Sequence, residues 1–348
     1  MQGEELTIAA VGDVVLARDD PQEAFRHVKD ELDDADLRCC NLEVPVSDEG
    51  MPQYWKFETL HSSPEMITGY TAAGFEVVSM ANNHAMDYGP IALIDTMRLL
   101  TSHGIAYVGA GENRQAAWSP LVQTVNGEQV AFVSFASEAF LGYGATATRP
   151  GIAMIRRDPL YGESGVSPDD VTDVQRAIRD ARRRARWVVA FFHWGLSQSR
   201  RPTTSQRHLA RAAVDAGADV VVGHHPHILQ GAEIYAGAPI LYSLGNFVFD
   251  LRPYFFGPGT YATAIAKVVL SPAGPARVDL LPVWIGDDGC PFRLAGDDSR
   301  SEQILAEIQQ LSADLATQVT VDSGVAHIAA VTASDSGTPA AMSSDKLD

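Results

Sequence analysis

The sequence predicts an α/β fold, and two observations support this prediction. Short apolar runs rich in Val and Ile, typical of buried strands, alternate with longer segments whose apolar residues recur at helical spacing. Polar side chains follow several of these runs directly, which is where sites form in α/β sheets. The 348 residues suffice for one large α/β domain, and we expect a single domain over residues 1–318 and a disordered tail over residues 319–348.

Strands and helices alternate in the N-terminal part of the chain. The first apolar run ends at Gly12-Asp13, and Pro21 opens a helical pattern. Gly74 and Gly104 stop the next two helical patterns. The expected strands are residues 6–11, 36–43 and 75–80, and the expected helices are residues 21–35, 64–73 and 90–100.

The rest of the chain contains two clear local signals. Asn126-Gly127 lies between two apolar runs, which predicts a β-hairpin. Ser167-Pro168 followed by two acids predicts a helix start, because it combines a cap, a proline and first-turn negative charge. Residues 140–166 are rich in Gly, Thr and Pro and predict a long loop over a site. The other expected elements are strands at 121–125, 130–135, 187–192, 219–222 and 240–247, a hairpin pair over 261–285, and helices at 167–186, 205–216 and 302–316.

Composition and charge exclude several classes of partner. A formal net charge of −18 argues against nucleic acid, because phosphate contacts need clustered Lys and Arg, and more weakly against anionic membranes and polyanionic substrates. Cys39, Cys40 and Cys290 have neither disulfide nor zinc-ribbon spacing. No secretion signal or membrane-spanning run is visible. We therefore expect a cytoplasmic protein with reduced thiols, no nucleic-acid partner and no membrane attachment.

Three imidazoles follow the β-branched run at residues 219–222, within the stretch Gly223–His227. A buried strand needs apolar side chains, whereas imidazole is the commonest metal ligand and the usual acid–base group near neutral pH. A metal-binding or catalytic role is therefore favoured over a structural one. Metal-competent side chains also follow four other strands, so we expect one shared site. The set comprises Asp13, Glu43, Asn83, His84, His193, His225 and His227.

Several sequence blocks, in this order, resemble one protein family. They are similar to the CapA family of poly-γ-glutamate capsule synthesis proteins, which is built on the calcineurin-like metallophosphoesterase fold. The resemblance spans roughly residues 6–290 and implies a β-sandwich flanked by helices, with a metal centre at one end. The blocks are Gly12–Leu16, Asn41–Glu43, Ala81–Gly89, His193–Gly195, Gly223–His227 and Tyr242–Phe247.

The resemblance also implies roles for individual residues. Asp13 matches the first metal-binding aspartate of the superfamily, and Glu43 stands where a metal-bridging aspartate is expected. Asn83 and His84 match an asparagine ligand and the adjacent catalytic histidine. His193 matches a later ligand, His225 and His227 match the paired histidines near the end, and His224 is an additional one that we interpret as structural.

Two departures from the family pattern bear on the metal. Val15 occupies the place of a histidine that phosphoesterases of this fold usually carry, and Glu43 replaces an aspartate. One ion of a two-metal centre would lose a nitrogen ligand, so a single cation held mostly by oxygen is expected. Ca²⁺ or Mn²⁺ is favoured, with Mg²⁺ or Zn²⁺ as alternatives.

Asp87 lies three residues after His84 and is expected to orient its ring, although capping of the helix near Pro90 is an equal alternative. By family geometry, Asp13 would form a second aspartate–histidine pair with His227 or His225. The resulting assignment has Asp13, His84, Asp87 and His227 as catalytic residues, and Glu43, Asn83, His193 and His225 as metal ligands.

Other polar and aromatic residues receive simpler interpretations. Trp194 and Tyr88 flank site residues, and they either line a pocket for an aromatic group or pack in the core. Asn246 is either a site residue or a turn former. The histidines expected at the surface of helices are His27, His103 and His208.

Three functions remain open at this stage. The chain resembles the CapA-like peptide epimerases of lasso-peptide gene clusters, which implies inversion of a Cα centre of a precursor peptide, expected at its C-terminal aromatic residue, by Asp/His acid–base chemistry. The alternative is a CapA-like metal-dependent hydrolase or phosphoesterase, in which His84 protonates the leaving group, or a protein of capsule poly-γ-glutamate synthesis. A third interpretation is a binding module that kept the fold and the metal but lost the chemistry.

Overall fold

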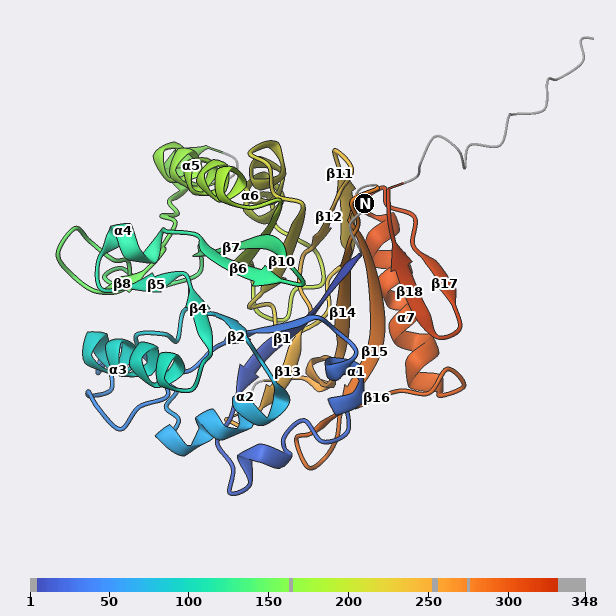
Figure 1. Ribbon diagram of the computed structural model, residues 1–348, viewed down its shortest axis with the longest axis horizontal. Helices are drawn as coiled ribbons and strands as arrows, with labels where there is room; N and C mark the ends of the chain where they lie inside the picture. The colour runs from blue at the N-terminus through green and yellow to red at the C-terminus, as the bar shows by residue number, and fades with distance from the viewer. Residues whose placement is uncertain (1–4, 163–164, 252–255, 274–275, 331–348) are drawn as a thin grey trace, which may run out of the picture.

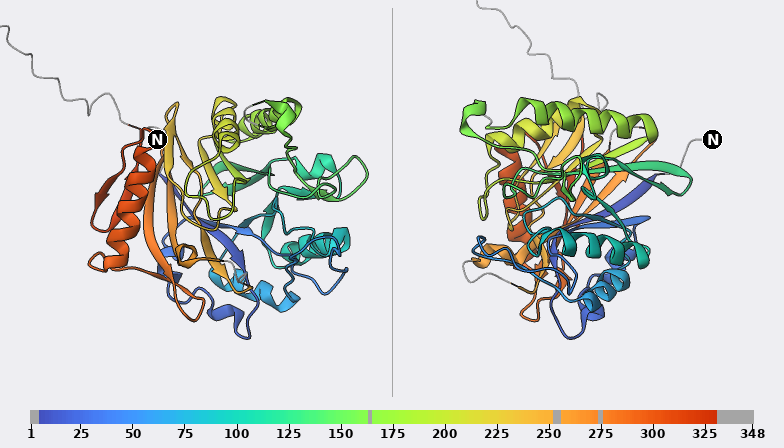
Figure 2. Two further views of the ribbon diagram at one scale, coloured as in Figure 1. Left: turned by 180° about the vertical axis from the view of Figure 1, so that it is seen from behind. Right: turned by 90° about the vertical axis from the view of Figure 1, so that its left-hand side faces the viewer.

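Two β-sheets pack face to face, and helices cover their outer faces (Figure 1). The computed structural model describes residues 5–162, 165–251, 256–273 and 276–330. In the right-hand view of Figure 2 the strands lie between an upper and a lower layer of helices. The architecture confirms the expected α/β fold of the calcineurin-like metallophosphoesterase type, a β-sandwich flanked by helices.

The first sheet has strand order β17-β18-β15-β14-β1-β2-β3-β4, with β13 also paired to β1 and β16 to β15. Strands β1, β2, β3 and β4 run parallel, so the carboxyl ends of β1, β2 and β3 point the same way. The strands are β1 (Leu6–Val15), β2 (Leu37–Leu42), β3 (Val77–Ser79), β4 (Ala106–Val108), β13 (Asn246–Phe249), β14 (Ala262–Leu270), β15 (Arg277–Ile285), β16 (Pro291–Arg293), β17 (Thr320–Asp322) and β18 (Val325–Ile328).

The second sheet has strand order β11-β12-β10-β9-β7-β6. Strands β7, β9 and β10 run parallel, and the hairpin β6–β7 turns at Asn126-Gly127 as expected. The strands are β6 (Leu121–Val125), β7 (Glu128–Ala136), β9 (Trp187–His193), β10 (Val220–His224), β11 (Ala232–Tyr235) and β12 (Ala238–Leu241), and a separate pair joins β5 (Ala110–Gly111) to β8 (Gly151–Ile152).

The strands are apolar on both faces because both faces are buried. In β7, Val130 and Phe132 face the core between the sheets, whereas Ala131 and Val133 face the helical layer. This two-sided burial explains the near-continuous apolar runs in the sequence. Helices α2 (Ile67–Ala73) and α3 (Gly89–Ser102) cover the first sheet, α5 (Pro168–Arg184) and α6 (Thr204–Asp215) cover the second, and α7 (Ser299–Ala313) packs on β15, β18 and β11, with short helices α1 (Lys29–Asp33) and α4 (Arg114–Ala117) elsewhere.

Two predicted elements are wrong. The helix expected over residues 21–35 is reduced to a 3₁₀ turn at Pro21–Glu23 and to the five-residue helix α1. The strand expected over residues 240–247 is divided, because the chain leaves β12 in the second sheet and enters β13 in the first. This crossing sets Asn246 opposite Asp13 in the pairing of β13 with β1.

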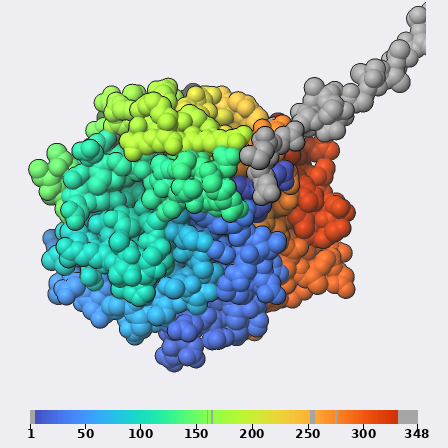
Figure 3. All heavy atoms as spheres, viewed as in Figure 1, coloured from blue at the N-terminus to red at the C-terminus, as the bar shows by residue number. Residues whose placement is uncertain are grey.

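The C-terminal part of the chain forms one side of the molecule, drawn in orange and red in Figure 3. The disordered tail expected from residue 319 is wrong for residues 320–328, because β17 and β18 extend the first sheet and bury Ala326 and Ile328. Residues 331–348 of that expected tail lie outside the described residues. Across the described ranges, none of the helices has the length and apolar character needed to span a membrane.

Candidate metal and acid–base centre

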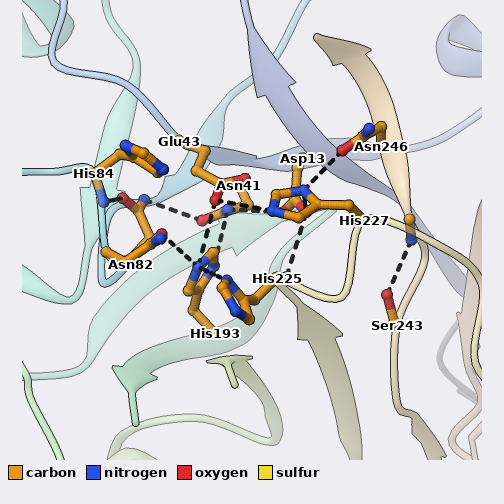
Figure 4. A network of polar contacts seen from close by, with 12 residues as sticks. Asp13, Asn41, Glu43, Asn82, His84, His193, His225, His227, Ser243 and Asn246 are labelled. Atoms are coloured by element: carbon orange, nitrogen blue, oxygen red, sulfur yellow. Dashed lines mark hydrogen bonds and ion pairs between the residues drawn. The ribbon is translucent and has the colours of Figure 1, made fainter. Parts of the chain in front are cut away.

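The candidate site lies where strand ends of both sheets meet. The ends of β1 and β2 bring Asp13 and Glu43, and the segment after β3 brings Asn83. The second sheet contributes His193 at the end of β9 and the turn after β10, which carries the paired histidines. Figure 4 shows the labelled carboxylates and imidazoles pointing toward one another from these elements.

Two overlapping sets of side chains could hold a metal ion. Glu43, His225 and His227 form one set, and Asp13, Glu43 and His193 form the other. Within each set, the ligand atoms lie within 4.8 Å of one another. The geometry therefore groups Asp13 and His227 with the potential ligands and does not separate them as a distinct catalytic set.

Glu43 has an unusual environment for a carboxylate. Its side chain is fully buried, and both oxygens lack a hydrogen-bond partner among the described residues. Burial, followed by the nearby charge of Asp13, raises the pKa of Glu43 well above its ordinary range. Because an unpaired buried carboxylate is costly, these residues fit a cation between them.

The surroundings of His193 and His225 favour the neutral imidazole, which metal ligation requires. Burial, followed by the charge of His227, lowers the pKa of His225 to about 3. Burial also lowers the pKa of His193 well below its ordinary range. His193 Nε2 lies 2.8 Å from Asn83 Oδ1, 3.1 Å from His225 Nδ1 and 3.4 Å from Glu43 Oε1, so Asn83 borders the same space.

The turn after β10 places its histidines with a strained backbone. His225 has φ of +92° and His227 has φ of +60°, a region that residues with a Cβ rarely adopt. His227 Nδ1 lies 2.9 Å from Asn246 Oδ1 and 3.4 Å from Asp13 Oδ2. Asn246 is thus a site residue, and together with Asp13 it holds the His227 ring in its orientation.

His84 and Asp87 form a hydrogen-bonded pair at the edge of the site. His84 Nδ1 lies 2.6 Å from Asp87 Oδ2. Helix α3 begins after Tyr88 without any side-chain cap, so the alternative of Asp87 as a helix cap is wrong. Burial lowers the pKa of His84 even though Asp87 raises it. In Figure 4, His84 and His227 lie on opposite sides of Glu43.

Several polar residues of the site were not assigned from the sequence. Asn41 Nδ2 donates to Asp13 Oδ1 at 2.9 Å and lies 3.3 Å from His193 Nδ1, so it joins the two sheets. Asn82 Nδ2 donates to the Leu42 carbonyl at 2.7 Å. Asn41 ends an apolar strand, as Asp13 does, and that signal was available in the sequence.

Two further predictions concern residues beside the site. His224 is buried and its Nε2 lies 3.2 Å from the Val11 carbonyl, which agrees with a structural role. Val15 is fully buried in the core under the helices, so it supplies packing where phosphoesterases of this fold carry a histidine. Trp194 is a core residue, because it is fully buried, stacks on Phe192 and donates its indole N–H to the Tyr242 carbonyl.

The three histidines expected at the surface of helices, His27, His103 and His208, are all exposed. Only His208 lies in a helix, because His27 falls in the turn before α1 and His103 directly follows α3.

Comparison with known proteins identifies similar chains. A family model described as "Bacterial capsule synthesis protein PGA_cap" matches residues 7–251. The chain is 34% identical over 301 residues to the "Capsule biosynthesis protein CapA" of Bacillus anthracis, covering 83% of this chain and 70% of that protein. It is 31% identical over 313 residues to the "PGA biosynthesis protein CapA" of Bacillus subtilis, covering 87% and 77%. A "Probable polyglutamine synthesis accessory protein" of Mycobacterium tuberculosis is 29% identical over 250 residues, covering 71% and 64%.

Proposed function

The chain belongs to the bacterial capsule synthesis protein family PGA_cap, and from this membership we propose that it is a metal-dependent enzyme acting on an amide-linked glutamate chain. The observation that carries the proposal is the fully buried pair Asp13 and Glu43, which three imidazoles border. Within the part of the chain that the structure describes, neither Glu43 oxygen has a hydrogen-bond partner. These buried charges fit a bound cation, and the hydrogen-bonded imidazoles beside them supply the acid–base groups that catalysis requires.

The residues that would hold the cation are Asp13, Glu43 and His193, with Asn83 and His225 at the border, and this leaves Nε2 of His227 for proton transfer. Two carboxylates and an amide oxygen favour Ca²⁺ or Mn²⁺, and the imidazoles also suit Zn²⁺. A bound divalent cation supplies a Lewis acid that polarises a substrate carbonyl. The number of ions is expected to be one, because Val15 offers no ligand.

The chain's own residues supply the proton transfers. Asp87 holds Nδ1 of His84 and leaves the opposite ring nitrogen, Nε2, to give or take a proton. On the other side of Glu43, Asn246 and Asp13 hold Nδ1 of His227, and its Nε2 lies 3.9 Å from Glu43 Oε1. In hydrolysis, one of these imidazoles would protonate the leaving amine.

A second candidate is inversion of a Cα centre in a precursor peptide. It is favoured by the two held imidazoles on opposite sides of Glu43, because inversion needs a base on one face of the carbon and an acid on the other. The peptide's C-terminal aromatic residue would be the modified position. The same metal centre and the same histidines would serve both reactions.

One experiment separates the candidates. The purified protein with Mn²⁺ or Ca²⁺ is incubated in D₂O with poly-γ-glutamate or with a precursor peptide encoded beside its gene, and both are followed by mass spectrometry and chiral analysis. Shortened glutamate chains, lost with EDTA and in His84→Ala, would support the hydrolase. An intact peptide that gains one deuterium and a D-residue would support the epimerase. If neither substrate changes and His84→Ala binds the substrate as tightly as the wild type does, the result would support the binding module.

A further inference from the structure

Lys56 is a buried lysine that reaches the candidate site from the irregular segment at residues 47–61. Its side chain is 4% exposed. The Nζ atom donates to the Asn83 carbonyl at 2.8 Å, forms an ion pair with Asp87 and lies 3.1 Å from His84 Nδ1. One ammonium group therefore contacts three residues of the segment that carries the acid–base histidine.

The backbone around Lys56 is tied to the same aspartate on both sides. The amide of Gln53 donates to the Asp87 carbonyl at 2.9 Å, and the amide of Leu60 donates to Asp87 Oδ2 at 2.7 Å. These bonds fix the ends of the segment, so Lys56 has little freedom to leave its position. A lysine costs more free energy to bury than a Met of similar volume. A lysine that only filled space would therefore be unfavourable here, and the contacts of Lys56 indicate a specific role.

Asp87 is the residue through which Lys56 acts. Its Oδ1 accepts from Lys56 Nζ and from the Tyr143 hydroxyl, the latter at 3.0 Å. Its Oδ2 accepts from the Leu60 amide and lies 2.6 Å from His84 Nδ1. Asp87 is fully buried, so it needs a positive partner, and Lys56 supplies that charge.

The contacts also determine where the proton of the His84 ring lies. An ammonium group has donors only, and Lys56 already has two good acceptors in Asp87 and the Asn83 carbonyl. The short contact from Nδ1 to the Asp87 carboxylate requires a proton between them, and Nδ1 supplies it. Nδ1 is then a donor to Asp87, and Nε2 is the ring nitrogen that is left for substrate.

Two aromatic rings close this arrangement from outside. Lys56 Nζ lies 5.2 Å from the centroid of the Phe140 ring and 5.9 Å from that of Tyr143. Trp55 packs edge-on against both rings, so it links the segment at residues 47–61 to the segment that carries Phe140 and Tyr143. Cation–π contact of this kind stabilises a desolvated ammonium group and keeps water away from it.

We propose that Lys56 is a positioning residue: it holds Asp87 and the Asn83 backbone so that the His84 ring keeps Nδ1 on Asp87 and presents Nε2 to the substrate. The inference rests on the proposed function, in which His84 moves a proton. Lys56 is the residue that holds Asp87 in place. The Tyr143 hydroxyl gives further support, because it donates to Oδ1 of the same carboxylate.

The first test does not depend on turnover. Protein labelled with ¹⁵N-histidine and loaded with Ca²⁺ is examined by NMR at neutral pH, with the His84 signals assigned by comparison with His84→Gln. The wild type is expected to show a proton on Nδ1 and none on Nε2. Lys56→Met should lose this single tautomer, whereas Lys29→Met, at a lysine that pairs with Asp33 on the surface, should keep it. An unchanged His84 signal in Lys56→Met would overturn the proposal.

The second test uses the activity found for the wild type. Lys56→Met is expected to lower kcat by about 100-fold, as a misplaced catalytic group does, with KM and cation affinity within about twofold of wild type. In Lys56→Ala, whose short side chain leaves room for them, ethylammonium ions should restore part of the rate. A normal kcat, or a loss explained by lost cation affinity, contradicts the proposal. If Lys56→Met does not fold, Lys56→Gln takes its place in both tests. Absence of any wild-type turnover would refute the proposed function, and the NMR result would still decide the role of Lys56.

Discussion

Among single residues, Glu43 has the least favourable surroundings in the site. A fully buried carboxylate beside a second buried carboxylate, with no hydrogen bond to either oxygen among the described residues, loses hydration without compensation. The effective cost of burying such an ion is several kcal/mol. A divalent cation would offset this cost, because it attracts both Glu43 and Asp13.

The first prediction concerns this carboxylate. Glu43→Gln keeps the size of the side chain and removes its charge, so the affinity for Mn²⁺ or Ca²⁺ should fall at least about 10-fold, the lower bound seen for supporting groups around metals. Isothermal titration calorimetry on chelator-treated protein measures it. Glu49→Gln, at an exposed position six residues later, is the control and should bind as the wild type does. Equal affinities in both variants would place the cation elsewhere.

His225 provides a prediction in which stability and binding change in opposite directions. Its φ of +92° is strained for a side chain with a Cβ, and a glycine there is relaxed. His225→Gly should therefore raise the free energy of unfolding by about 0.5–1 kcal/mol in urea with chelator, and lower the cation affinity. The same change at His208, exposed in helix α6, should lower stability, because glycine disfavours a helix. A less stable His225→Gly protein would show that the turn carries no strain.

The sequence predicts some site residues and not others for a physical reason. Asp13 and His193 lie near the carboxyl ends of the apolar strands β1 and β9, and strand ends are recognisable from the residue pattern. Lys56 and Tyr143 come from irregular segments without periodicity, so only the folded chain brings them to Asp87. Asn41 lies between these cases, since it stands near the end of β2 but two residues before the carboxylate of Glu43, which has the stronger metal-binding signal.

At the scale of elements, the end of β10 depends on a close approach of two chain segments. A Cβ on Gly223 would lie 2.1 Å from the Tyr242 carbonyl oxygen and 2.5 Å from Trp194 Nε1. Gly223 therefore leaves room for the hydrogen bond between Trp194 and Tyr242, which joins the segments after β9 and β12. The glycine before the histidines is thus a packing requirement of the sheet.

This close approach gives the third prediction. Gly223→Ala should lower the free energy of unfolding by about 1–3 kcal/mol, the usual cost of overpacking, and should also reduce the cation affinity by displacing the turn after β10. Urea unfolding followed by tryptophan fluorescence measures the stability. Gly296→Ala is the matched control, because the added Cβ has only ordinary contacts there. If the two variants unfold at the same urea concentration, the neighbouring backbone is free to move aside.

Elements were predicted well where one local rule determines them. The Asn126-Gly127 hairpin and the start of α5 after Ser167 follow from turn and cap chemistry alone. The sequence predicts residues 240–247 as one strand, because apolar residues recur from Ile240 to Phe247 in spite of Ser243, Gly245 and Asn246 between them. Their division between β12 and β13 depends on which sheet each half pairs with, and this is a long-range property.

At the scale of the whole molecule, the site exists only because strand ends of both sheets meet at one side of the sandwich. Asn41 from the first sheet contacts His193 from the second, and Asn246 reaches Asp13 through the crossing chain. The alternation of strands and helices predicts parallel sheets, but it does not say that the chain divides its strands between two of them. The division into a β-sandwich is expected only from the family resemblance. The strands β17 and β18 remained unpredicted, since their composition resembles that of a tail and their stability comes from pairing with β15.

The last prediction follows from this dependence on both sheets. A cation that binds Asp13, Glu43 and His193 joins β1, β2 and β9, and it finds no such arrangement in the unfolded chain. Binding should therefore stabilise the whole fold, by about 2.7 kcal/mol when the free cation is at 100 times its Kd, and EDTA should reverse the effect. Thermal unfolding with increasing Mn²⁺ or Ca²⁺ is expected to raise Tm by several degrees in a concentration-dependent way. Glu43→Gln should show a smaller rise, because an affinity about 10-fold lower reduces the stabilisation at the same cation concentration to about 1.4 kcal/mol. A rise in that variant equal to that of the wild type would mean that the stabilising ion binds outside this centre.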